Sequence, residues 1–234
     1  MDKRPPRCIG LIGGLGPGAT IHYYKGLIGA YTLQDEVPDL VIIHADVNQV
    51  LRLVGEGDIS GLAHYLAEII ERLKDARATV CAIPAITPHI CAPLLATITR
   101  LPLISMVDVL RAGLSRRKLR RIALFGTRFT VESDVFGQLT DYDVIRPRPA
   151  EVDRVHNIYT SLVETGRGSD EQARQLQDIA HRLIDEDAVE AIVMAGTDLA
   201  VLIDAERADY PLIDCAQLHI EEIVCRTLGS QAQT

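Results

Sequence analysis

Short apolar runs alternate along this chain with longer segments in which apolar residues recur every three or four positions. The short runs predict buried strands, and the longer periodic segments predict amphipathic helices. We expect the strands at residues 8–12, 40–44, 79–83, 121–125 and 191–194. Strands that alternate with helices are typical of βαβ units, so the pattern predicts an α/β protein with parallel-type sheets flanked by helices.

Two of the periodic segments predict helices most clearly. Ser60 is placed to cap the first of them. The apolar face of that helix consists of Leu62, Leu66, Ile69, Ile70 and Leu73. A later segment repeats the spacing with Leu176, Ile179 and Leu183. Because the opposite faces are polar, each helix should cover a sheet on one side and meet water on the other.

The chain also contains an internal repeat. Ile9-Gly-Leu-Ile-Gly13 resembles Ile122-Ala-Leu-Phe-Gly126, and Pro102-Leu-Ile-Ser105 resembles Pro211-Leu-Ile-Asp214. Thr87 and Thr197 each follow a predicted strand, 110 residues apart. The order of these features predicts two pseudo-symmetric domains, residues 1–104 with 210–234 and residues 105–209. Ligands of open parallel sheets bind beyond the carboxyl ends of the strands, so we expect a small anionic metabolite in the cleft between the halves.

Charge and composition exclude several classes of function. The formal net charge of −8 disfavours binding to nucleic acid, which attracts proteins through Lys and Arg. The densest basic cluster, residues 116–121, is better explained as a helix end and the loop before the next strand. No run approaches the ~18 apolar residues of a membrane span, and glycines interrupt the apolar stretch near the N-terminus. The five cysteines have no C-x-x-C spacing, which favours reduced thiols in a cytoplasmic protein.

A glycine-rich loop follows the first predicted strand. Its sequence, Gly13-Gly-Leu-Gly-Pro-Gly-Ala-Thr20, lacks both the G-x-G-x-x-G spacing of dinucleotide-binding proteins and the Lys-Ser/Thr of a P-loop. The loop could direct the backbone N–H groups of Gly14, Leu15 and Gly16 at an anion, or it could be only a tight strand-to-helix turn. Both alternatives remain open.

Polar residues also follow the second predicted strand. Asp46 and Gln49 come directly after it, and Arg52 lies shortly beyond. A guanidinium at this place could hold a substrate carboxylate through two parallel hydrogen bonds. The three residues therefore form a candidate binding segment, although each alone could be an ordinary loop residue in contact with water.

The loops after the third strand and its counterpart are Pro84-Ala-Ile-Thr-Pro-His89 and Ala195-Gly-Thr-Asp198. Together with the glycine loop, the segment through Arg52, and Thr127, Thr130 and Ser133, they resemble the aspartate/glutamate racemase superfamily over nearly the whole chain. Ile158-Tyr159 and Pro211-Leu-Ile-Asp214 match recurring positions of that family. The resemblance implies two pseudo-symmetric α/β domains, a homodimer and no pyridoxal phosphate or other cofactor.

The resemblance also implies a two-cysteine mechanism that this chain departs from. Family racemases hold one cysteine in a P-C-N-T-x-H loop and another in a G-C-T-E loop, on opposite faces of the substrate α-carbon. Here Ala85 and Ile86 replace the first Cys-Asn pair, Gly196 replaces the second cysteine, and Asp198 replaces the glutamate. Alanine and glycine carry no exchangeable side-chain proton, which excludes the two-thiol mechanism. Cys81 and Cys91 are interpreted as small core residues.

Three functional hypotheses follow. The first is an isomerase or lyase acting on a small carboxylate, in which Asp46, His89 or Asp198 is the general base. The hydroxyl groups of Thr87 and Thr197 and the loop N–H groups would stabilise enolate charge. The second is a racemase that uses His89 and Asp198 on opposite faces. The third is a metabolite-binding protein without turnover. No ligand spacing supports a metal site built from His44, Asp46 and His89.

Overall fold

The structure is a computed structural model that describes residues 7–203 and 208–228. The chain forms two compact units. Unit 1 contains the described residues up to Met106 together with those from His219 onward, and unit 2 is Val107–Leu218. The sequence predicted a division into residues 1–104 with 210–234 and residues 105–209, whereas the second division lies nine residues later, between Leu218 and His219. Unit 1 is therefore built from two separated stretches of chain, whereas unit 2 is continuous.

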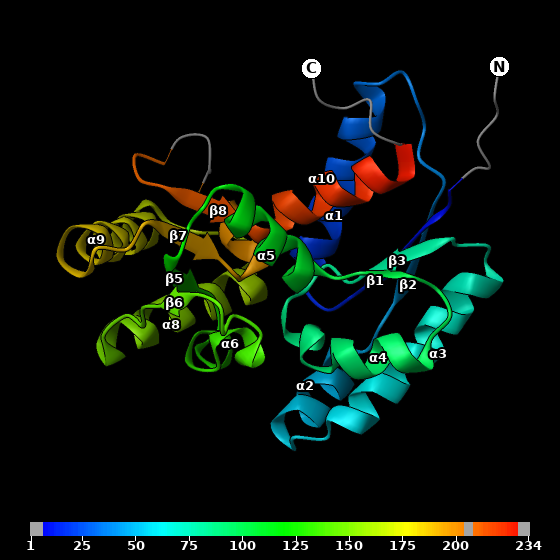
Figure 1. Cartoon of the computed structure of the whole chain (residues 1–234), viewed down its shortest axis with the longest axis horizontal. Helices are drawn as coiled ribbons and strands as arrows, with labels where there is room; N and C mark the ends of the chain where they lie inside the picture. The colour runs from blue at the N-terminus through cyan, green and yellow to red at the C-terminus, as the bar shows by residue number, and fades with distance from the viewer. Residues whose placement is uncertain (1–6, 204–207, 229–234) are drawn as a thin grey trace. The chain divides into compact units, whose positions relative to one another are not determined.

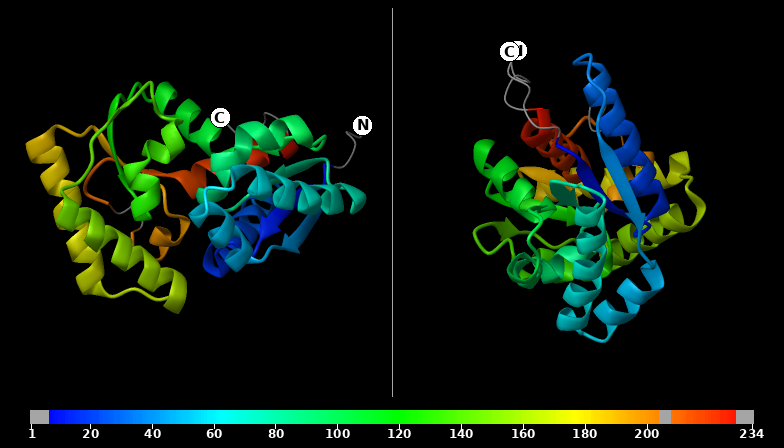
Figure 2. Two further views of the ribbon diagram at one scale, coloured as in Figure 1. Left: turned by 90° about the horizontal axis from the view of Figure 1, so that it is seen from below. Right: turned by 90° about the vertical axis from the view of Figure 1, so that its right-hand side faces the viewer.

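Unit 1 contains a four-stranded parallel sheet in the order β2-β1-β3-β4. Its strands are β1 (Ile9–Gly13), β2 (Leu40–His44), β3 (Val80–Ala82) and β4 (Leu103–Ile104). Its helices are α1 (Pro17–Thr32), α2 (Val47–Gly55), α3 (Ile59–Asp75), the 3-10 helix η1 (Thr87–Cys91), α4 (Ala92–Ile98) and the later part of α10 (Cys215–Leu228). Helices α1 and α10 lie together on one face of the sheet, and α3 and α4 lie on the other (Figure 1). Helix α2 leads into α3 on that second face (Figure 2).

Unit 2 repeats this arrangement with the strand order β6-β5-β7-β8, again all parallel. The strands are β5 (Arg121–Phe125), β6 (Asp143–Val144), β7 (Ala191–Met194) and β8 (Leu212–Asp214). The helices are α5 (Met106–Arg116), α6 (Arg128–Glu132), α7 (Asp134–Gly137), α8 (Pro149–Thr165), α9 (Asp170–Asp187), the 3-10 helix η2 (Thr197–Val201) and the start of α10. Apolar residues of α8 and α9 pack against β5 and β7 in one buried cluster.

The internal repeat is confirmed by the topology. Each unit places its first strand second in the sheet and its third strand beside it, so β1, β2, β3 and β4 correspond to β5, β6, β7 and β8. Helices η1 and η2 begin at Thr87 and Thr197, the two threonines that the repeat had paired. The predicted fold class, two α/β domains with parallel sheets flanked by helices, is confirmed.

Helix α3 forms as its apolar spacing predicts, but it begins earlier. The side chain of Asp58 accepts a hydrogen bond from the backbone N–H of Gly61 at 2.8 Å and caps the helix. Ser60 lies inside the first turn, so its predicted capping role is wrong. A carboxylate two residues upstream reaches the free N–H groups of the first turn instead. The buried face of α3, which includes Leu62, Leu66 and Leu73, covers the sheet as expected.

The four cysteines inside the fold are free and buried, and Cys225 is free and exposed. Burial raises the pKa of Cys81 and of Cys91 to about 12, so both thiols stay protonated at neutral pH. They behave as small core residues rather than as replacement nucleophiles. Within the described ranges, no helix offers an apolar stretch long enough to cross a bilayer.

Candidate functional site

The glycine loop of unit 1 is a tight turn whose shape requires glycine at one position. Gly14 has a φ of +87°, and a Cβ there would lie 2.6 Å from the carbonyl oxygen of Ala45. The N–H of Gly14 donates to Oγ1 of Thr20 at 3.0 Å, and that hydroxyl donates to the carbonyl oxygen of Gly16 at 3.1 Å. The side chain of Thr20 thus bridges Gly14 and Gly16, the residues on either side of Leu15, and stabilises the turn. Because the N–H of Gly14 already donates to Thr20, the loop has fewer N–H donors for an anion than the sequence suggested.

The segment after β2 forms a helix start. The carboxylate of Asp46 accepts the N–H groups of Asn48 at 2.8 Å and Gln49 at 3.4 Å, so Asp46 caps α2. Arg52 lies one turn further along α2, is exposed, and pairs with Glu56 at 2.7 Å. The structure therefore gives Asp46 a structural role as a helix cap and gives Arg52 a carboxylate partner at the C-terminal end of the same helix. Their predicted roles toward a substrate stay predictions.

The loop after β3 contains Ala85, Ile86 and Thr87 and continues into η1. Ile86 is buried, and Ala85 and Thr87 are partly buried. The fully buried ring of His89 is held at both nitrogens: Nδ1 lies 2.9 Å from the carbonyl oxygen of Ala85, and Nε2 accepts the N–H of Met106 at 3.0 Å. A base needs a free nitrogen lone pair, and the backbone of Met106 already takes the one on Nε2. This geometry argues against His89 as the general base.

A second buried histidine from α10 lies beside His89. The rings of His89 and His219 are 6.3 Å apart, edge to face. Nε2 of His219 lies 2.8 Å from the carbonyl oxygen of Ile104, and Nδ1 lies 2.9 Å from the hydroxyl of Tyr23. Burial, with the neighbouring His89 as a smaller cause, lowers the pKa of His219 to about 3. Two neutral histidines thus hold the end of β4 and the start of α5, which is a structural function.

In unit 2, the predicted threonines meet at the carboxyl end of β5. Thr127 caps α6 by accepting the N–H of Thr130 at 3.1 Å, and the two hydroxyl oxygens lie 2.9 Å apart. Thr130 is fully buried. Gly126 precedes them, and a Cβ on it would lie 3.4 Å from the backbone N of Gly196 in the next strand end. The strand ends of β5 and β7 therefore approach closely.

The loop after β7 contains the buried polar groups Thr197 and Asp198, which are 6% and 5% exposed. Oγ1 of Thr197 lies 3.5 Å from Oδ2 of Asp198. Tyr159 of α8 joins them, because its phenol forms side-chain hydrogen bonds with both residues. Burial first, and then the charge of Asp198, raise the pKa of Tyr159 above its usual value, while the hydrogen bond from Thr197 lowers it. Tyr159, Thr197 and Asp198 form a cluster that we call the β7-end cluster.

The β7-end cluster includes a residue that sequence reasoning assigned no role. Tyr159 appeared only as a recurring family position on a predicted helix. Its ring packs over Gly196, because a Cβ there would lie 2.5 Å from Cε2 and 2.7 Å from Cδ2 of Tyr159. The signal in the sequence was the glycine itself: a missing side chain at a strand end indicates that another group comes close.

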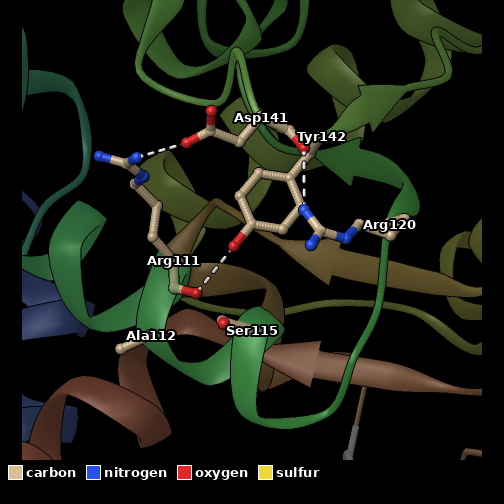
Figure 3. Close-up of a pocket in the computed structure, with 6 residues that line it drawn as sticks. All are labelled: Arg111, Ala112, Ser115, Arg120, Asp141 and Tyr142. Atoms are coloured by element: carbon tan, nitrogen blue, oxygen red, sulfur yellow. Dashed lines mark hydrogen bonds and ion pairs between the residues drawn. The ribbon is translucent and has the colours of Figure 1, made fainter.

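A polar hollow of about 440 Å³ lies elsewhere in unit 2, between α5 and the turn before β6 (Figure 3). Its groups satisfy one another: Arg111 pairs with Asp141 at 2.6 Å, and the hydroxyl of Tyr142 donates to the carbonyl oxygen of Arg111 at 2.9 Å. Residues 116–121 nearby form the end of α5 and the loop into β5, as predicted. The hollow contains none of the predicted site residues.

The predicted residues gather at the strand ends of their own units. In unit 2 the structure brings Thr197 together with Asp198 and Thr127 with Thr130, with Gly196 beside them. The predicted pairing of His89 with Asp198 joins different units and stays a prediction. Within the described part of the chain, no three His, Cys, Asp or Glu side chains gather closely enough to hold a metal ion.

Comparisons with known proteins agree with this architecture. A protein from Yersinia pestis assigned to the Asp/Glu racemases is 24% identical, with a TM-score of 0.84 over 95% of this chain and 99% of its own. An aspartate racemase homologue from Pyrococcus horikoshii is 20% identical, with a TM-score of 0.82 over the same shares.

The fold also extends to a more distant structure. Glutamate racemase from Francisella tularensis, in complex with D-glutamate, is 14% identical, with a TM-score of 0.64 over 97% of this chain and 84% of its own. At these low sequence identities, the TM-scores show that the proteins share a fold. The model of the Asp/Glu/hydantoin racemase family matches residues 12–223, which is most of the chain. The protein therefore belongs to the Asp/Glu/hydantoin racemase family.

Proposed function

We propose that the protein is an isomerase or lyase that acts on a small amino acid or related carboxylate by acid/base chemistry without cysteine. Family membership supports an enzyme of the racemase type. The observation that carries the proposal is the buried carboxylate of Asp198 at the end of β7, two residues after the glycine that replaces the family's second cysteine. A carboxylate at this place can accept a proton where the thiolate of relatives would.

The remaining groups have supporting roles. Thr197 and the backbone N–H groups at the strand ends are donors that could stabilise the negative charge developing on a substrate enolate. A single positioned acid or base typically contributes ~10²–10⁴-fold to a rate. That is sufficient for elimination, tautomerisation or hydrogen exchange of an activated carboxylate, each of which needs proton transfer at one face of the reacting carbon.

The racemase that pairs His89 with Asp198 is less well supported. Racemisation requires a second base on the opposite face, and both ring nitrogens of His89 are engaged by backbone groups of unit 1. Ala85 and Ile86, at the positions of the family's first Cys-Asn pair, offer no titratable group. The geometry therefore favours proton transfer that depends on unit 2.

Proton NMR in D₂O tests the proposal. The protein is incubated with acidic amino acids, their N-acyl and cyclic derivatives, and related keto and unsaturated acids. We expect loss of an α-proton signal, or a new product resonance, from at least one compound, and a fall of ~10²-fold or more in that rate in Asp198→Asn. The matched control is Asp209→Asn, an exposed carboxylate of unit 2 that bonds to Gln177 and His181. Equal rates in wild type and Asp198→Asn would overturn the proposal.

A further inference from the structure

Tyr159 occupies the space that a side chain at position 196 would need. An ideal Cβ on Gly196 would lie 2.5 Å from Cε2 of the Tyr159 ring, far inside van der Waals contact. The clash involves the ring edge, which cannot bend away as a flexible chain end could. A thiol at position 196 and the observed ring therefore exclude each other. The ring of Tyr159 can occupy its observed position only because residue 196 is a glycine and not the family's second cysteine.

The phenol brings its own proton-handling group to that place. Its O–H donates to the carboxylate of Asp198, and its oxygen accepts from the hydroxyl of Thr197. Asp198 is 5% exposed, and Tyr159 as a whole residue is partly buried. Within unit 2, hydrogen bonds thus link the phenol to a buried carboxylate.

We propose that Tyr159 and Asp198 form a phenol–carboxylate relay that replaces the second thiol and exchanges a proton with one face of a small carboxylate substrate. In the forward step, the bond between the substrate α-carbon and its hydrogen breaks, and the proton passes to Oη of Tyr159. The original phenolic proton moves to the carboxylate of Asp198, and the electron pair of the broken bond stays on the substrate as an enolate. The reverse step returns a proton to the same face.

The relay works without forming a free phenolate. Removing a proton from Tyr159 alone would place a second negative charge beside Asp198 in a buried place, which is costly. When the two transfers are coupled, the phenol stays neutral and the buried carboxylate becomes a neutral acid. The hydrogen bond with Thr197 lowers the pKa of Tyr159 and so partly offsets the effects of burial and of the Asp198 charge.

The relay belongs to unit 2 only. The equivalent loop of unit 1 has Ala85 at the cysteine position and the fully bonded His89 beyond it. Hydrogen exchange through the relay therefore proceeds with retention of configuration rather than with racemisation. The inference rests on the proposed function and narrows it to reactions that begin with deprotonation of a carbon next to a carboxylate.

The hydrogen bonds of the relay can be tested without any substrate. Protein labelled with ¹³C at Cζ of tyrosine is titrated by NMR, and the Tyr159 signal is assigned by its loss in Tyr159→Phe. We expect this signal to keep the shift of a neutral phenol to a higher pH than exposed tyrosines do. In Asp198→Asn it should titrate at a lower pH, because the neighbouring charge is gone. An unchanged titration in Asp198→Asn would overturn the relay.

The catalytic part is tested with L- and D-aspartate and L- and D-glutamate in D₂O. We expect deuterium at the α-carbon without formation of the enantiomer on chiral chromatography. Tyr159→Phe should slow this exchange by ~10²-fold or more, whereas the buried-tyrosine control Tyr210→Phe should not slow it. Appearance of the enantiomer at the rate of exchange would overturn the one-face assignment.

The outcomes also separate the two proposals. Wild-type exchange rates in Tyr159→Phe, together with loss of exchange in Asp198→Asn, would overturn the relay and leave the proposed function standing. Full exchange in Asp198→Asn would overturn the proposed function itself. No exchange with any of the four amino acids would overturn the relay as a catalytic device for acidic amino acids and leave Tyr159 and Asp198 as a structural pair.

Discussion

Two loops that occupy equivalent places in the repeat differ in what their polar groups do. The η1 loop of unit 1 directs its polar side chain, His89, into backbone partners on both sides. The η2 loop of unit 2 directs Thr197 and Asp198 toward another side chain, Tyr159. The backbone arrangement is the same, but the hydrogen bonds of one loop fix the fold, while those of the other are the ones that we propose transfer a proton. Position in a fold therefore does not determine a catalytic role.

The residues that correspond to the two buried histidines in the repeat show the same difference. His89 and His219 of unit 1 correspond in the repeat to Leu199 and Leu110, which are fully buried in unit 2. Unit 1 thus has two buried histidines where unit 2 has two buried leucines. A buried polar pair depends on every hydrogen bond being made, whereas an apolar pair does not. Unit 1 should be the more sensitive of the two to changes of pH and of side chain.

The largest expected effect is that of acid on unit 1. His219 has a pKa of about 3 in the folded protein, compared with the ordinary histidine value of 6.5 that applies in the unfolded chain. Between these values the unfolded chain binds a proton that the folded chain does not, so the free energy of unfolding falls as the pH falls. Through this one group, the free energy of unfolding falls by about 1.4 kcal/mol per pH unit. The fall is complete once the pH is below the pKa of His219 in the folded protein.

Urea unfolding at several values between pH 7 and pH 4 measures this dependence. His219→Gln removes the titrating group while keeping a donor and an acceptor. The slope of its free energy of unfolding against pH should therefore be smaller than that of wild type, by the amount that corresponds to about one proton. His64→Leu, which removes an exposed histidine of α3, should keep the wild-type slope. The same slope in wild type and in His219→Gln would contradict the assignment of the buried neutral state.

The next largest effect is expected from making unit 1 resemble unit 2 at one position. His89→Leu introduces the residue type that stands at 199 and leaves the carbonyl of Ala85 and the N–H of Met106 without their partner. Each unsatisfied buried group costs about 1–3 kcal/mol, so the loss of both partners should lower the free energy of unfolding by about 2–6 kcal/mol. His64→Leu should change it by no more than ~0.5 kcal/mol. A neutral result for His89→Leu would mean that the two loops do not differ as described.

A smaller effect is expected from restoring the family's residue in unit 2. Gly196→Cys should destabilise by about 1–3 kcal/mol, because its Cβ meets the Tyr159 ring. In the double variant Tyr159→Ala/Gly196→Cys the clash is absent, so the double-mutant cycle should show a favourable coupling of similar size. Gly29→Cys is the control, because its Cβ would meet open space. Strictly additive effects would show that ring and thiol do not compete.

The smallest effect concerns the carboxylate of unit 1. Asp46 caps α2, so Asp46→Ala should lower the free energy of unfolding by about 1 kcal/mol. The free energy of unfolding of Asp46→Asn should stay within a few tenths of a kcal/mol of the wild-type value, because asparagine caps a helix about as well as aspartate does. Thermal or urea unfolding of the two variants measures both values. A large loss in Asp46→Asn would show that the negative charge itself is needed, as it is proposed to be for Asp198.

Much of the fold could be predicted because its signals are local or repeated. Strands β2, β5 and β7 have the limits that their apolar runs predicted. The two- and three-residue strands β4, β6 and β8 are too short to show a periodicity and were not predicted as strands, although the repeated Pro-Leu-Ile sequences marked two of them. Helix α3 is capped by Asp58 rather than by Ser60, and from sequence alone either side chain could have capped it.

The site was less predictable because its decisive contacts are tertiary. The role of His89 depends on the backbone of Met106, seventeen residues away, and on the packing of His219 beside it. The role of Tyr159 depends on its approach to Gly196 from another helix. Residue identity indicated which groups could carry a proton, but only the packing decided which were already committed to the fold.

The interrupted path of the chain has a consequence for biosynthesis. Because α10 supplies His219 to unit 1, that unit is begun first and can be completed only after all of unit 2 has left the ribosome. At synthesis rates of ~5–20 residues per second, Tyr23 waits about 10–40 seconds for the ring of His219, which bonds to its hydroxyl. During this interval the face of α1 that later packs against Ile220 is uncovered. The nascent chain should therefore bind hydrophobic-segment chaperones through α1 until α10 emerges.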